Sequence, residues 1–130
     1  MSFIFDEGKG KTSLFLTAWK SLEKYESHPD FPIYLAHLLV NNLYHLIYSK
    51  QYDLAQKTIC RLYELTDDIN MLSWKTPLLY YDGLLCYVKG DTERGLASIE
   101  NAKSIYKLSG HTFMVEQMDA GLNELRNKKY

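Results

Sequence analysis

The sequence is weakly similar to itself at an offset of 40 residues, and this period constrains the fold more than any other feature. The residues that coincide are Gly10, Lys50 and Gly90, then Trp19, Ile59 and Ile99, then Leu22, Leu62 and Ala102. Such a period fits helix–turn–helix hairpins that each bury an apolar face by stacking on the next. It predicts about three hairpins, six helices in all, stacked as a short right-handed α-solenoid. Chance similarity between amphipathic helices is the alternative.

The composition and the positions of helix-capping and helix-breaking residues both indicate helices. The chain has 20 Leu but only 7 Ile and 3 Val, a ratio that favours helix over strand. Capping residues, glycines and prolines divide it into predicted helices at residues 12–26, 32–49, 53–65, 69–89, 92–110 and 112–126. Pro77 predicts either a kink at residues 73–76 or a helix that starts only at about Pro77. The fold class is therefore predicted to be all-α.

Length and charge fit a single domain. The chain has 130 residues and a net charge of -1, without the basic excess of a nucleic-acid binder. We expect a flexible N-terminal lead at residues 1–11 and a helical-repeat domain at residues 12–130. No apolar run approaches the roughly 18 residues of a membrane span, and the N-terminus does not have the pattern of a signal peptide. Cys60 and Cys86 fit no disulfide or metal spacing, so a cytoplasmic location is expected.

Catalytic motifs are weak. Gly10-Lys11-Thr12 is similar to the end of a phosphate-binding loop, but that pattern needs a glycine where Phe5 stands. A lead into a capped helix is the simpler interpretation. The histidines lack the spacing and acidic neighbours of a metal site, and both cysteines lie in apolar helical surroundings where thiols are usually inert. We therefore expect no enzymatic activity, no metal and no cofactor.

A polar and aromatic stripe runs along the second predicted helix. Steps of three and four residues place its members on one face: Tyr34, His37, Asn41, Tyr44 or His45, and Tyr48. Asn42 is the neighbour of Asn41 in the sequence. Asn amides suit a peptide backbone because they both donate and accept, and Tyr supplies rigid contact area. We predict that these residues, together with Trp74 and Tyr81, line a peptide groove in which Asn41 clamps the backbone. Packing between helices is the alternative interpretation.

Two stretches resemble a known family. The string YSKQYDLA at residues 48–55 is similar to the start of a tetratricopeptide repeat, with Ala55 as the small packing residue. The string LYYDGLLCYVKGD at residues 79–91, with Gly95-Leu96 and residues 102–106 after it, resembles the C-terminal regulatory domain of the Rgg/GadR/MutR transcription regulators. These belong to the peptide-pheromone receptors with tetratricopeptide-like domains. The resemblance covers about residues 35–125.

The resemblance implies a homodimeric, non-enzymatic regulatory domain whose concave face receives a signalling peptide or protein segment. In that family an N-terminal helix-turn-helix domain binds DNA. Residues 1–11 are too short for such a domain, so we expect no direct contact between this chain and nucleic acid, and no membrane partner. A tetratricopeptide-like scaffold or adaptor without a peptide ligand is the alternative function.

Overall fold

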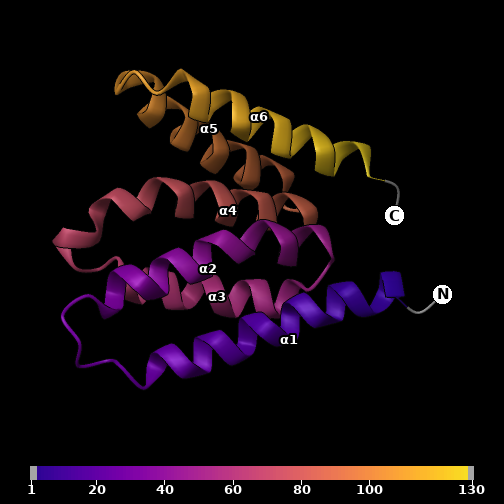
Figure 1. Ribbon diagram of the computed structural model, residues 1–130. Coiled ribbons are helices and arrows are strands. Elements are labelled where there is room, and N and C mark those ends of the chain that lie inside the picture. Colours follow the sequence, from indigo (N-terminus) through magenta and orange to yellow (C-terminus); the bar gives the residue numbers. More distant parts are fainter. Residues whose placement is uncertain (1–2, 129–130) are drawn as a thin grey trace. The chain divides into compact units, whose positions relative to one another are not determined.

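The computed structural model describes residues 3–128, with side chains from Gly10 onward, and every regular element in that range is helical (Figure 1). The elements are α1 (Phe3–Glu23), α2 (Phe31–Tyr48), α3 (Tyr52–Leu65), the 3₁₀-helix η1 (Ile69–Trp74), α4 (Lys75–Val88), α5 (Thr92–Leu108) and α6 (Thr112–Asn127). The predicted all-α class is confirmed.

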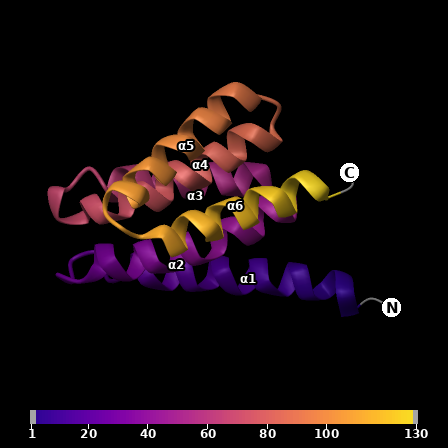
Figure 2. The ribbon, with the colours of Figure 1, turned by 90° about the horizontal axis from the view of Figure 1, so that it is seen from above.

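The chain divides into two compact units, Met1–Met71 and Leu72–Tyr130. In the first unit, α2 packs against both α1 and α3, and its fully buried side chains are Leu35, Ala36, Leu39, Leu43, Leu46 and Ile47. In the second unit, α5 packs against both α4 and α6, and Figure 2 shows α4 and α5 side by side. The right-handed solenoid over residues 12–130 stays a prediction.

The first and third helices of each unit run parallel and are joined by polar contacts between residues 38 or 39 positions apart. These contacts are Thr12–Gln51 and Glu23–Arg61 in the first unit, and Tyr80–Met118 and Tyr87–Arg126 in the second. The buried Tyr80 hydroxyl, for example, donates to the Met118 carbonyl oxygen at 2.9 Å. Contacts at this spacing are those expected of hairpins with a period of 40 residues.

Helices α4 and α5 approach each other so closely that their backbones touch. A Cβ atom at Gly95 would lie 2.6 Å from the Gly83 carbonyl oxygen and 2.7 Å from the Tyr87 nitrogen. A Cβ atom at Gly83 would in turn lie 2.8 Å from the Gly95 oxygen. Ordinary contacts of a Cβ atom begin at 3.4 Å, so both positions require glycine. The first unit has the fully buried Ala55 at the position 40 residues before Gly95.

Three helices end in the same left-handed turn. The residue with positive φ is Lys50 (64°) after α2, Gly90 (103°) after α4 and Gly110 (79°) after α5. In each turn the next residue donates its backbone N–H to the carbonyl five positions earlier, as Gln51 does to Leu46 at 2.8 Å. This is the Schellman pattern, in which glycine is the usual residue. Lys50 therefore holds a conformation that costs a side-chain-bearing residue about 1 kcal/mol.

The predicted start of the first helix at residue 12 is wrong, because α1 already begins at Phe3. The glycines at positions 8 and 10 suggested a break, but each costs a helix only about 1 kcal/mol. Of the predicted lead at residues 1–11, Met1 and Ser2 lie outside the described residues. Thr12 is inside the helix, and its hydroxyl bonds to the Gln51 side chain rather than capping α1.

Pro77 is the third residue of α4, and the 3₁₀-helix Ile69–Trp74 comes before it. The first backbone N–H groups of a helix have no acceptor inside that helix, so the N–H that proline lacks is not missed there. Of the two interpretations of Pro77, a helix that starts close to it is therefore the better one, and α4 starts two residues earlier.

Candidate functional site

A hollow of about 440 Å³ lies between α1 and α2 in the first unit. The lining from α1 is mostly apolar and consists of Lys11, Leu14, Phe15 and Ala18. The lining from α2 is mostly polar and consists of Leu38, Asn41, Asn42 and His45. Leu14 is 73% exposed and contributes apolar surface to this lining. The hollow brings together three of the residues predicted to line a peptide groove, namely Asn41, Asn42 and His45.

The three polar side chains differ in how far their hydrogen-bonding capacity is used. Asn41 is exposed. Asn42 is half-buried, and its amide Nδ2 donates to the Leu38 carbonyl oxygen of its own helix at 2.8 Å. The Nε2 atom of His45 is buried and has no hydrogen-bond partner in the described part of the chain. Because buried polar atoms are normally paired, the Nε2 atom of His45 is available for a hydrogen bond to a ligand in the hollow.

A second hollow of about 310 Å³ follows at the turn that joins the same two helices, lined by Leu22, Tyr25, His28, Phe31 and Tyr34. Because α1 and α2 are antiparallel, the two hollows follow one another along one helix pair; we call them together the α1–α2 groove. Tyr34, a fourth predicted residue, is 54% exposed here and lies against the His28 ring with centroids 6.3 Å apart.

The other four predicted residues do not join the groove. His37 is exposed and lines neither hollow, and Tyr48 stacks on Tyr44 at the end of α2 with ring centroids 6.0 Å apart. Trp74 and Tyr81 belong to the second unit. Tyr81 packs against the ring of Tyr80, and burial raises the pKa of the Tyr81 hydroxyl. The stripe on α2 is therefore split, and its role in peptide binding stays a prediction.

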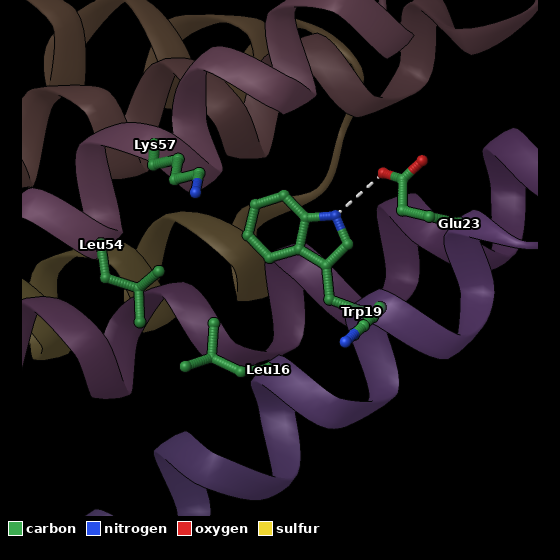
Figure 3. Close-up of a pocket in the computed structure, with 6 residues that line it drawn as sticks. Leu16, Trp19, Glu23, Leu54 and Lys57 are labelled. Atoms are coloured by element: carbon green, nitrogen blue, oxygen red, sulfur yellow. Dashed lines mark hydrogen bonds between the residues drawn. The ribbon is translucent and has the colours of Figure 1, made fainter.

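Sequence reasoning missed a third hollow, between α1 and α3, which we call the α1–α3 trough (Figure 3). It measures about 360 Å³ and is lined by Leu16, Trp19, Lys20, Glu23, Leu54 and Lys57. Trp19 coincides with Ile59 and Ile99 in the 40-residue repeat, but those two residues are buried whereas Trp19 is half-buried. The only hint of the trough in the sequence is that Leu16 is apolar but outside the coinciding positions of the repeat; its exposed fraction of 44% is known from the structure alone.

Glu23 is held in place at one end of this trough. Its Oε1 atom accepts from the Trp19 indole N–H at 2.9 Å and from the Arg61 guanidinium at 3.0 Å. Partial burial by itself would raise the pKa of Glu23, but the hydrogen bonds from Arg61 and Trp19 and the Arg61 charge lower it overall. The carboxylate is thus ionised and already satisfied by the chain itself.

The segment Gly10-Lys11-Thr12 is part of α1, so it is not a loop. Backbone N–H groups inside a helix bond to the preceding turn and cannot cradle a phosphate.

Burial raises the pKa of the Cys86 thiol, which favours the unreactive protonated form. Among the described residues, no three His, Cys, Asp or Glu side chains gather as a metal site would require. In the same part of the chain, no helix combines the length and apolarity that a membrane crossing requires.

A family model described as "HTH-type transcriptional regulator Rgg, C-terminal domain" matches residues 8–120. The chain belongs to this family. The Rgg resemblance found in the sequence is therefore confirmed, and with it the assignment to a regulatory domain of transcription regulators. No curated protein and no solved structure matches this Rgg C-terminal domain.

Proposed function

We propose that this Rgg C-terminal domain is a non-enzymatic, cytoplasmic regulatory domain that binds a short peptide or protein segment and acts as a homodimer. The observation that carries the proposal is the α1–α2 groove. It combines exposed apolar surface at Leu14 with three polar side chains, at Asn41, Asn42 and His45, in a domain of a transcription-regulator family.

The groove is suited to a segment of backbone with alternating apolar side chains. Its two hollows follow one another along α1 and α2, so successive side chains of one segment could enter them in turn. The Asn41 amide is exposed beside the first hollow and can both donate to and accept from a backbone amide. Tyr34 offers an aromatic wall at the second hollow, with an apolar ring and a polar tip.

Regulation follows if the bound segment favours one arrangement of the dimer over another. A ligand shifts such an equilibrium only by the difference between its affinities for the two arrangements. The α1–α2 groove is built on two long helices, so a segment that bridges them would be sensitive to their separation. Segment binding and dimerisation would then be coupled, and each would strengthen or weaken the other by the same factor.

The test starts from a displayed library of random octapeptides selected against the whole chain, with an enriched peptide then labelled and titrated by fluorescence anisotropy. Asn41→Ala should weaken binding by about 1–3 kcal/mol, or roughly 5- to 150-fold, because a backbone group of the peptide loses its partner. His37→Ala is the matched control, since His37 lies one turn away on the same helix outside both hollows. Equal affinities of the two variants, or a lack of enriched peptides, would contradict the proposal.

A further inference from the structure

The α1–α3 trough presents an apolar floor between positive charges. Leu16, Trp19 and Leu54 form the floor, and Figure 3 shows the first two on α1 facing Leu54 on α3. Lys20 and Lys57 stand on either side, both exposed, and within the described residues neither makes an ion pair. The acidic residue of the trough, Glu23, is already engaged by Arg61. The trough therefore selects for an apolar segment that carries carboxylates.

One segment of this chain has that chemistry. Residues 3–7 read Phe-Ile-Phe-Asp-Glu, three large apolar residues followed directly by two carboxylates. The composition of this segment matches a floor that takes apolar side chains, next to ammonium groups that take acidic ones. Exposed ion pairs are each weak, but two of them beside buried apolar groups add specificity to the contact.

We propose that residues 3–7 of one copy of this chain dock in the α1–α3 trough of a second copy. The same copy cannot supply them, because Phe3–Glu23 is one continuous helix. Residue 7 precedes Leu16 by nine positions on that helix, so about 13 Å along the helix axis separates its backbone from the start of the trough. Reciprocal exchange of the two segments gives a closed dimer with two identical contacts. This inference rests on the proposed homodimer and names the contact that forms it.

A charge-reversal cycle on the full chain tests the contact. The first variant is Asp6→Lys with Glu7→Lys, the second is Lys20→Glu with Lys57→Glu, and the third combines all four substitutions. Sedimentation equilibrium at low micromolar concentration gives the dimer dissociation constant of each. We expect each double variant to weaken the dimer about tenfold or more, since two attractive pairs become repulsive at each of the two contacts, and the combined variant to recover most of the loss.

A second measurement follows the trough itself. The chain has two tryptophans, so Trp74→Phe leaves Trp19 as the reporter, and its emission should shift to shorter wavelength as the dimer forms. Lys24→Glu with Lys107→Glu changes the net charge by the same amount at exposed lysines outside the trough, and it should leave the dissociation constant within twofold. Circular dichroism at 222 nm verifies that every variant is folded.

The outcomes separate the two proposals. If the full chain dimerises and neither reversal changes the dissociation constant, the docking of residues 3–7 is refuted while the homodimer stands. If both reversals weaken the dimer but the combined variant does not recover, the charges do not face each other and the docking is likewise refuted. A full chain that stays monomeric at 100 µM would refute the homodimer and the docking together.

Discussion

The backbone contact between α4 and α5 makes Gly95→Ala a sharp test of the packing in the second unit. The added Cβ atom would lie 2.6 Å from the Gly83 oxygen and 2.7 Å from the Tyr87 nitrogen, both on the opposite helix. Backbone atoms cannot turn aside as a side chain can. To reach an ordinary contact, α5 must retreat from α4 by about 0.8 Å, a gap that forfeits a quarter to a half of the van der Waals attraction along the interface.

The net cost follows from two opposing effects. Overpacking of this kind costs about 1–3 kcal/mol, whereas replacing glycine by alanine inside a helix gains about 1 kcal/mol. We expect Gly95→Ala to lower the free energy of unfolding by up to about 2 kcal/mol, or up to roughly 8 °C in Tm. Urea denaturation followed by circular dichroism at 222 nm measures the loss.

Gly10→Ala is the control for this substitution. A Cβ atom at Gly10, in α1, would have no atom within 4 Å, so only the gain in helix propensity remains. That variant should be up to about 1 kcal/mol more stable than the original chain. If Gly95→Ala gains as much as Gly10→Ala does, α4 and α5 are not in backbone contact and the reasoning is wrong.

Three further predictions concern single groups. Lys50→Gly should raise the free energy of unfolding by about 1 kcal/mol in urea denaturation, because glycine holds the left-handed turn at φ 64° without strain. Glu23→Gln should lower the free energy of unfolding by about 1 kcal/mol at pH 7, a value discounted for solvent screening because the Glu23 side chain is 34% exposed. Because the pKa of Glu23 is lowered in the folded chain, the ionised carboxylate stabilises the fold above the ordinary pKa of 4.5. The difference in stability between the variant and the original chain should therefore vanish in urea denaturation as the pH falls below that value. In the second unit, burial raises the pKa of Tyr80, and the hydrogen bond to Asp119 raises the pKa of Lys103. The protonated forms of both groups therefore stabilise the folded unit fully below about pH 10, and this stabilisation is lost as the pH rises further. Thermal melts at pH 8 and pH 11 should show the second unit unfolding first at the higher pH.

The number and order of the helices could be predicted because local signals agree with the fold. Leucine-rich stripes and glycine at the helix ends are signals within one helix or one turn, and the 40-residue period reflects the stacking of neighbouring hairpins. The start of α1 at Phe3 was missed because two glycines count as breakers in a local analysis, whereas helix continuity over 21 residues offsets their cost. Lys50 was aligned with Gly90 by the period alone, and the structure gives the reason, since both hold a left-handed turn.

The candidate site was predicted only in part, and the reason is geometric. Steps of three and four residues keep side chains on one broad face of a helix, but that face is wider than the contact with any single neighbour. Asn41 and His45 line the groove between α1 and α2, whereas His37 lies on the same stripe and lines neither hollow. Which neighbour covers which edge is decided by tertiary packing. For the same reason, the exposure of Leu16 beside Trp19 in the trough could not be read from periodicity.

The paired contacts between α1 and α3 also limit how the length of this chain can change. Thr12 meets Gln51 and Glu23 meets Arg61, so the segment between these helices has a set length. One residue inserted inside α2 would rotate everything after it by about 100° and turn Gln51 and Arg61 away from their partners at the same time. The turn at residues 24–30 can absorb an extra residue by bulging outward. Insertions and deletions among relatives should therefore gather in that turn and leave α2 at constant length.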